Sequence, residues 1–308
     1  MALKQVIVRK PDLDAIGAAA LAGVTQADWM LCLVGGEAPA DLLADPAILC
    51  LECGGSGQVN LGNFDHHGAE APAATAVEQM YDHLGSPSAW REIVDYIAWV
   101  DSGGLRGQAS PSILAPETTL SGLLSGLFLL EPDLAARFWL GAALVREAQL
   151  SGLAPWNLQP GLDHYYRWRV YAEAKSVARQ SLVARRDQVR LIHSALAPWP
   201  ILALSCDLPG AHGLLRDMGG RVRLAHRPGD HFTISVDDDL RPWLAGLLEF
   251  LNQHDPGWGG PSGGAIIGSP FGGSKFTFEA FCRLLETADV QPNSKAFLSS
   301  SLLGRTVW

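Results

Sequence analysis

The chain has 308 residues, of which 48% are hydrophobic and 18% are charged. This composition excludes a disordered chain, and the length suits two domains that each bury a hydrophobic core. The formal net charge is −9, and most of the excess acid lies in residues 1–189, which argues against a protein that coats nucleic acid through a basic surface. The negative net charge does not exclude a small anionic substrate, because bound divalent cations can reverse the sign of the local electrostatic field.

The first part of the chain alternates short apolar runs with polar loops. Strands are predicted at residues 5–8, 29–34, 47–53 and around 61–64, and a helix is predicted at residues 15–23. This alternation favours an α/β domain with a mostly parallel sheet flanked by helices. The middle of the chain has apolar spacing near 3.6 and is predicted to be helical at residues 75–84, 88–100, 117–130, 132–151 and 164–190.

The pattern changes near residue 190, after a long helical segment that would act as a connector. A strand is predicted at 199–206, a helix at 210–218, a hairpin from 220–226 and 232–236, and helices at 240–253 and 276–287, with a glycine-rich segment at 257–273. We therefore expect two domains, residues 1–190 and a smaller α/β domain at residues 191–308.

Acidic residues and histidines stand at the ends of the predicted elements in the first domain. They are Asp12 and Asp14, Glu52, the run Asp65-His66-His67, and Asp101. In an open α/β sheet, groups that follow the strands converge outside their carboxyl ends. Each motif alone has a common structural explanation, since Asp-x-Asp often caps a helix. Their ordered occurrence favours a site for hard or borderline divalent ions such as Mn²⁺ or Mg²⁺.

The same residues resemble the motifs of the DHH phosphoesterase superfamily. Residues 11–17 (Pro-Asp-Leu-Asp-Ala-Ile-Gly) resemble motif I, Asp65-His66-His67 resembles the motif that gives the family its name, and Asp101-Ser102-Gly103 resembles motif IV. Glu52 stands where motif II usually has an aspartate. The glycine-rich segment, with Gly259, Gly260 and Gly268-Ser269-Pro270, resembles the substrate-binding loop of the family's C-terminal domain.

The resemblance implies a role for each matching residue. Asp14, His66 and Asp101 would hold one metal ion, Asp12 would hold a second ion, and Glu52 would bridge the two. Asp65 would orient a neighbouring ligand, and His67 would face the substrate phosphate as a hydrogen-bond donor or general acid, so that the catalytic set is His67, Asp12 and Asp14. In the family, metal-activated water attacks phosphorus, and the second domain supplies basic residues and glycine N–H groups to the phosphate oxygens.

Three positions depart from the family pattern. The histidine expected three residues before the proline of motif I is Val8, motif II has Glu52, and Pro261-Ser262 replaces a histidine after the glycines. The expected function is hydrolysis of a phosphoester or phosphoanhydride bond in a small phosphorylated metabolite, nucleotide or short oligonucleotide. The alternative is a non-catalytic protein that binds a phosphate ligand on the same fold after losing one metal site.

Basic residues of the second domain are further candidates for substrate binding. Arg221 and Arg223 would share one face of a strand and could grip a phosphate, or they could form an ordinary solvated strand face. Lys275 follows two glycines and a serine and is a second candidate, with a surface lysine as its alternative. The candidate substrate-binding residues are Arg221, Arg223, Gly259, Gly260, Ser269 and Lys275.

Five cysteines, an odd and sparse set, predict reduced thiols and a cytoplasmic protein. Cys50 and Cys53 form a C-x-x-C pair, which we interpret as buried structural thiols rather than a redox or zinc site, because no second pair exists. No signal peptide and no membrane span are expected. A small phosphorylated substrate or short oligonucleotide is the expected partner, long duplex nucleic acid is not expected, and a homodimer stays open.

Overall fold

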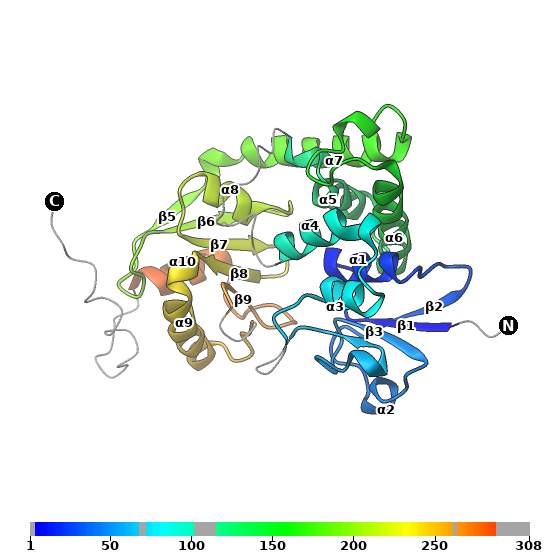
Figure 1. Cartoon of the computed structure of the whole chain (residues 1–308). Helices are drawn as coiled ribbons and strands as arrows, with labels where there is room; N and C mark the ends of the chain where they lie inside the picture. The colour runs from blue at the N-terminus through cyan, green and yellow to red at the C-terminus, as the bar shows by residue number, and fades with distance from the viewer. Residues whose placement is uncertain (1–3, 68–71, 102–114, 261–263, 288–308) are drawn as a thin grey trace, which may run out of the picture. The chain divides into compact units, whose positions relative to one another are not determined.

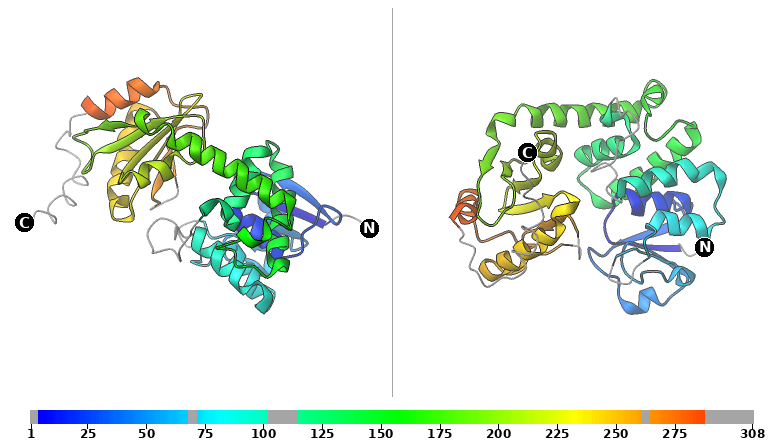
Figure 2. Two further views of the ribbon diagram at one scale, coloured as in Figure 1. Left: turned by 90° about the horizontal axis from the view of Figure 1, so that it is seen from above. Right: turned by 60° about the vertical axis from the view of Figure 1, so that its left-hand side comes forward.

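The computed structural model describes residues 4–67, 72–101, 115–260 and 264–287. The chain forms two compact units, Met1–Val177 and Ala178–Trp308. The division falls inside α7 (Tyr166–Val183), the long green helix that Figure 2 shows as continuous. The boundary expected at residue 190 stays a prediction. The connector helix is shorter than expected: it ends at Val183 and is followed by a 3-10 turn at Arg186–Gln188 and a strand that begins at Arg190.

The first unit contains the predicted parallel sheet. Its four strands lie in the order β2-β1-β3-β4, with every neighbouring pair parallel. They are β1 (Lys4–Val8), β2 (Trp29–Leu33), β3 (Ile48–Leu51) and β4 (Asn63–Phe64). The predicted fold of this unit, a parallel sheet with helices, is therefore confirmed.

Both faces of the sheet are buried at the central strands β1 and β3, as is usual for parallel strands. On one face, Val6, Val8 and Leu51 join the core that the helices cover. On the other face, Ile7 and Cys50 pack in a smaller cluster beside α2 (Ala40–Leu43). Figure 1 shows α1 and α3 on one side of the sheet and α2 on the other. Among the described residues before α7, the α-helices of the unit are α1 (Leu13–Leu21), α2, α3 (Ala76–His83), α4 (Arg91–Asp101), α5 (Leu120–Leu130) and α6 (Leu134–Ser151).

A glycine on α1 lets α4 approach closely. A Cβ atom added to Gly17 would lie 2.5 Å from the Cδ1 atom of Ile97, so a larger residue would force the Ile97 side chain to move. The predicted alanine-rich helix thus does more than cover the sheet. It brings the end of α4, where Asp101 lies, toward the start of α1, where Asp14 lies.

The second unit is built on a mixed sheet of five strands in the order β5-β6-β7-β8-β9. Only β6 and β7 run parallel, and the other neighbours are antiparallel. The strands are β5 (Arg190–Ile192), β6 (Ile201–Ser205), β7 (Val222–Arg227), β8 (His231–Val236) and β9 (Ile266–Gly268). The predicted hairpin is β7-β8, but the sequence analysis missed β5 and β9, because each is a run of three residues without a usable period.

Helices cover both faces of the second sheet. The core on one face includes side chains of α9 (Arg241–His254) and α10 (Phe278–Thr287). The opposite face packs against α8 (Ala211–Asp217) and Leu182 near the end of α7. Figure 1 shows α8 and α9 on opposite sides of this sheet. Within the described ranges of both units, no helix combines the length and apolar character that crossing a bilayer requires.

Candidate metal centre

The first turn of α1 presents two carboxylates just beyond the end of β1. Asp12 is the N-cap of the helix, and its Oδ1 accepts a hydrogen bond of 3.1 Å from the Ala15 N–H. Asp14 lies inside the first turn, and only 2% of its surface is exposed. Helix capping therefore explains the position of Asp12, but it does not explain why the carboxylate of Asp14 is buried.

Asp14 is anchored by a second helix. Its two carboxylate oxygens accept hydrogen bonds of 2.8 Å and 2.9 Å from the backbone N–H groups of Ala76 and Val77, at the start of α3. An anion is stabilised at a helix N-terminus by the free N–H groups and the helix dipole. These bonds fix the orientation of the Asp14 carboxylate.

Glu52 lies directly after β3 in an unusual backbone conformation. Its φ is 57°, in the left-handed region, which costs a residue other than glycine about 1–3 kcal/mol. Only 2% of Glu52 is exposed, and Oε1 is a buried atom with no hydrogen-bond partner within the described part of the chain. A buried carboxylate oxygen without a donor is costly, and a bound cation would supply the missing partner.

Asp65 orients His67. Its Oδ1 accepts hydrogen bonds of 2.8 Å from the ring Nδ1 and 2.9 Å from the backbone N–H of His67, and its Oδ2 accepts one of 2.7 Å from the Gly54 N–H. The hydrogen bonds with Asp65 and Glu52 raise the pKa of His67 to about 10. At neutral pH the ring is therefore an imidazolium that can donate a second hydrogen bond from Nε2.

His66 stands among three carboxylates from distant parts of the sequence. Its Nε2 atom lies 3.3 Å from Oδ2 of Asp101, 3.5 Å from Oε2 of Glu52 and 3.7 Å from Oδ2 of Asp14. These separations are long for hydrogen bonds, and they also suit ligands of one ion. Two atoms that each lie about 2.1 Å from a metal stand about 3.0 Å apart at a right angle and farther apart at wider angles.

Two overlapping groups of side chains therefore have the geometry to hold a cation. One consists of Asp14, His66 and Asp101, and the other consists of Glu52, His66 and His67. The first is the set that the family resemblance implied for one metal ion. In the second group, Nδ1 of His67 lies 3.0 Å from Oε2 of Glu52.

The electrostatics of the site favour a bound cation. Burial, followed by the nearby charge of Glu52, raises the pKa of Asp14 well above its usual value, and burial raises the pKa of Asp101. Burial also opposes ionisation of Glu52, but hydrogen bonds from His66 and His67 outweigh it and lower its pKa. The hydrogen bond with Glu52 is the main reason that the pKa of His66 is raised to about 9. In the metal-free protein the positive charge of the His66 imidazolium thus offsets the carboxylates, a role that a bound divalent ion would take over.

Asp12 belongs to neither group among the residues that the structure describes. Its Oδ2 lies 3.4 Å from Nζ of Lys10. Val8, at the position of the family's histidine, is fully buried at the end of β1. The second ion expected at Asp12 therefore lacks an imidazole ligand, and Asp12 is instead paired with Lys10, which the sequence analysis did not single out.

The two candidate arginines of the second unit are occupied by carboxylates. Arg221 pairs with Asp237 and Asp239 and lies over the ring of Trp199, 4.4 Å from its centre. Arg223 is only 5% exposed and hydrogen-bonds Oγ of Ser235 and Oδ1 of Asp237. Their predicted role in substrate binding stays a prediction, and a phosphate would have to compete with these carboxylates.

The candidates in the glycine-rich segment lie close to β8 and β9. Gly259 and Gly268 exchange backbone hydrogen bonds of 3.0 Å and 2.7 Å, and Oγ of Ser269 accepts one of 3.0 Å from the Phe232 N–H. Gly260 is exposed, and a Cβ atom there would lie 2.5 Å from the Ile266 carbonyl oxygen. Lys275 is exposed. Pro261 and Ser262, and also Ser102 and Gly103, lie outside the described residues.

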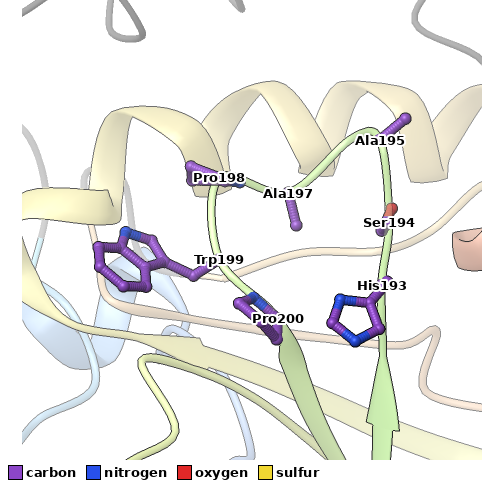
Figure 3. A pocket seen from close by; sticks show the side chains of 7 residues that line it. All are labelled: His193, Ser194, Ala195, Ala197, Pro198, Trp199 and Pro200. Atoms are coloured by element: carbon purple, nitrogen blue, oxygen red, sulfur yellow. The ribbon is translucent and has the colours of Figure 1, made fainter. Parts of the chain in front are cut away.

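Two other features, a pair of cysteines and a surface pocket, lie outside the candidate metal centre. Cys50 and Cys53 are both buried free thiols, as expected, and Sγ of Cys53 lies 3.6 Å from the Ile7 carbonyl oxygen. A surface pocket of about 330 Å³ lies in the loop between β5 and β6, lined by His193, Ser194, Ala195, Ala197, Pro198, Trp199 and Pro200. Figure 3 shows the imidazole of His193 beside the ring of Pro200. None of these residues belongs to the predicted site.

One supporting residue of the metal centre escaped the sequence analysis. Nε2 of Gln79 donates hydrogen bonds to the carbonyl oxygens of Asp65 and Ala74, at 3.1 Å and 2.8 Å. It thereby fixes the backbone that presents His66 and His67. Its only signal in the sequence is a polar residue on the buried face of a predicted helix.

No protein-family model and no curated protein matches this chain. Among solved structures, the chain is similar to the pGpG-specific phosphodiesterase PggH from Vibrio cholerae, with a TM-score of 0.53 and 14% identity over 91% of this chain and 95% of that one. RecJ from Thermus thermophilus in complex with Mn²⁺ also matches, with a TM-score of 0.43 and 15% identity over 87% of this chain and 49% of that one. The likeness to PggH confirms the predicted fold.

Proposed function

We propose that this chain, which has the fold of the DHH phosphoesterases, is a metal-dependent phosphodiesterase that hydrolyses a short nucleotide or another small phosphorylated compound. The main support is the position of His66, whose Nε2 lies within 3.7 Å of carboxylate oxygens from Asp14, Glu52 and Asp101. The substrate of the structural neighbour, pGpG, makes a 5′-phosphorylated dinucleotide the first compound to test.

The donor set fits a divalent ion. Carboxylate oxygens and imidazole nitrogen are ligands that Mn²⁺ and Mg²⁺ accept, and the unpartnered Oε1 of Glu52 is a buried acceptor without a donor in the described structure. Asp14, Glu52, His66 and Asp101 would hold the ion. When bound, such an ion polarises a phosphoryl oxygen and acidifies water, which provides a nucleophile at neutral pH.

The protein's own groups then have distinct tasks. The hydrogen bonds from α3 fix the orientation of the Asp14 carboxylate, which would help to hold the ion. Asp65 holds Nδ1 of His67, so Nε2 of His67 is the atom that would donate a hydrogen bond to a phosphate oxygen or a proton to the leaving group. In this arrangement Asp65 is a positioning residue, and His67 is the residue that touches the substrate.

We expect one Mn²⁺ ion per chain rather than two, because Asp12 is paired with Lys10 and Val8 provides no ligand. Titration calorimetry on metal-stripped protein measures this number. In Val8→His, an imidazole at the end of β1 should create a second, weaker site. Two ions per wild-type chain would contradict the one-ion model, and thermal unfolding of the variant would show whether the buried substitution is tolerated.

Mn²⁺ affinity should rise with pH. The pKa of His66 in the metal-free protein is raised to about 9, so at pH 7 the ring carries a proton that the ion must displace. We expect the apparent association constant to increase by about tenfold per pH unit below pH 9 for one released proton, and to level off above it. Calorimetry in buffers of different ionisation enthalpy counts the released protons. A pH-independent affinity would argue against His66 as a ligand.

The function itself is tested with a substrate panel in Mn²⁺ and Mg²⁺. The panel contains pGpG, longer single strands, a nucleotide bisphosphate, a cyclic dinucleotide, pyrophosphate and polyphosphate. Turnover of a small member with little cleavage of long DNA is expected. If the chain binds Mn²⁺ and a phosphorylated ligand without turnover of any member, the non-catalytic alternative, which the buried Val8 favours, replaces the phosphodiesterase.

A further inference from the structure

The second unit places a serine, a histidine and an aspartate in one hydrogen-bonded row. Oγ of Ser205 lies 2.7 Å from Nδ1 of His226, and Nε2 of His226 lies 3.3 Å from Oδ1 of Asp230. In the described structure, none of the three belongs to the groups of side chains that could hold a metal ion. A nucleophile, a base and a third group that orients the base, each within hydrogen-bond reach of the next, are the usual parts of a site for nucleophilic catalysis.

The register of the second sheet brings the serine and the histidine together. β6 and β7 run parallel, and Ser205 is the direct partner of His226. Ala203 and Leu224, two positions before them, lie in the core that α9 and α10 cover, so the two polar side chains continue this face at the carboxyl ends of the strands. The Cys206 N–H donates a hydrogen bond of 3.0 Å to the His226 carbonyl oxygen, which fixes the backbone just after the serine.

The histidine and the aspartate are also held in place. The His226 side chain is 12% exposed, and its ring packs against the rings of Phe232 and Phe278, with centroids 4.6 Å and 5.3 Å away. Asp230 lies in the turn between β7 and β8 with a φ of 54°, a left-handed conformation that aspartate adopts more readily than most residues. Its carbonyl oxygen accepts a hydrogen bond of 2.8 Å from the Ser274 N–H. The base and its partner are therefore preorganised before any ligand binds.

The position of the carboxylate determines which ring nitrogen of His226 can act as the base. An ionised carboxylate only accepts hydrogen bonds, so Nε2, which faces Asp230, carries the proton of the neutral ring. Nδ1 is then the acceptor for the Ser205 O–H. When that proton moves to Nδ1, the imidazolium that forms is stabilised by the Asp230 carboxylate. The separation of 3.3 Å is long for a hydrogen bond, as contacts between catalytic groups often are before a substrate binds.

Another contact between a serine and a histidine in this unit lacks these features. Oγ of Ser235 lies 2.9 Å from Nδ1 of His212, but Ser235 is only 8% exposed and its oxygen also accepts a hydrogen bond from Nε of Arg223. The other ring nitrogen of His212 faces the Thr233 hydroxyl, at 2.6 Å. Ser205, by contrast, is exposed. Of the two serines, Ser205 is the one that a substrate can reach.

We propose that Ser205, His226 and Asp230 form a second active site, independent of metal ions, that takes small carboxylic esters. Oγ of Ser205 attacks the carbonyl carbon and its proton passes to Nδ1 of His226. The bond from the carbonyl carbon to the alcohol oxygen then breaks, and His226 gives the proton to that oxygen. Water attacks the acyl group on Ser205 with the same help from His226, which releases the carboxylic acid and restores the serine.

The backbone after the serine limits the rate of this reaction. The N–H of the residue that follows a nucleophile is a usual donor to the oxyanion, but the Cys206 N–H already donates to the His226 carbonyl oxygen. We therefore expect esters with a good leaving group to react, and the acyl group to stay on Ser205 long enough to be detected.

The test uses the metal-stripped full-length protein in EDTA, with p-nitrophenyl acetate as the ester. A burst of about one p-nitrophenol per chain, followed by slow turnover, is expected, and the peptide that contains Ser205 should gain the mass of one acetyl group. Ser205→Ala should abolish the burst, and His226→Ala should slow it by about 10²- to 10⁴-fold. Ser181→Ala, which changes an exposed serine on α7 in the same unit, is the matched control and should react like the wild type.

Asp230→Asn tests the row without opening space beside the aromatic rings. Its amide can donate a hydrogen bond to Nε2 of His226, which would place the ring proton on Nδ1, so the burst should slow. Thermal unfolding of each variant shows whether the unit stays folded.

The outcomes separate this site from the metal centre. An acetyl group on Ser205 in EDTA, absent from Ser205→Ala and formed more slowly in His226→Ala or Asp230→Asn, supports the proposal whether or not the phosphodiesterase is active. A wild-type protein that is not acetylated at Ser205, or a burst that persists in Ser205→Ala, overturns the proposal. Acetylation of Ser205 at the wild-type rate in the folded His226 and Asp230 variants would show that the row does not activate the serine, and it would overturn the proposal too.

Discussion

His66→Ala is expected to abolish Mn²⁺ binding and to reduce kcat/KM for the active substrate by at least about 100-fold. The expectation follows because Nε2 of His66 is common to both groups of side chains that can hold an ion. Removing an outer partner of a metal ligand already costs about 10- to 100-fold, and removing the ligand itself should cost more. Calorimetry and steady-state kinetics on the same preparations measure the two losses.

The matched control for this variant is His164→Ala, which removes an exposed histidine of the same unit that is not part of the metal centre. It should keep wild-type metal binding and rates. Asp14→Asn is a poorer test, because both Asp14 oxygens accept N–H groups of α3 and an amide NH₂ would face one of those donors. That variant would lose stability by about 1–3 kcal/mol in addition to the ligand. Wild-type metal stoichiometry in His66→Ala would refute the proposed centre.

His67→Ala is expected to retain the ion and to lower kcat by about 10²- to 10⁴-fold, the usual contribution of a general acid or base. Asp65 occupies Nδ1 of His67, which leaves Nε2 to meet the substrate. At neutral pH the ring holds a proton on both nitrogens, because its pKa is raised to about 10 by hydrogen bonds with Asp65 and Glu52. Single-turnover rates together with Mn²⁺ stoichiometry separate the loss of proton transfer from the loss of metal.

Asp65→Asn tests the role of His67 as a proton donor by changing the residue that orients it. This substitution removes the negative charge that orients His67, and it should lower kcat less than His67→Ala does. The pH profile of kcat should also shift to lower pH, because the pKa of His67 falls when its anionic partner is lost. Loss of the ion in His67→Ala would instead identify His67 as a metal ligand, through the group that it forms with Glu52 and His66.

The order of strands and motifs was sufficient to predict the fold of the first unit. Strands that alternate with helices build a parallel sheet, and the groups that follow the strands then share one edge. For this reason Asp14, Glu52 and His66 could be assigned to one site before any distance was known. In the structure, a carboxylate oxygen of Asp14 and one of Glu52 lie within 3.7 Å of Nε2 of His66. Local periodicity also predicted the hairpin β7-β8, since a turn of Pro and Gly lies between two alternating runs.

Other properties depended on contacts between residues far apart in the sequence. The hydrogen bonds from α3 to Asp14 and the burial of Arg223 against Asp237 have no local signature. The strands β5 and β9 were missed for the same reason, because each is defined by its neighbour in the sheet.

The sequence by itself therefore determined the class of fold and the residue types of the candidate metal centre, because both follow from local periodicity and from the edge of a parallel sheet. Only the tertiary structure decided which carboxylates lie within reach of one ion and which charged groups are already paired. These depend on distances and burial, which are set when separate helices and strands pack together.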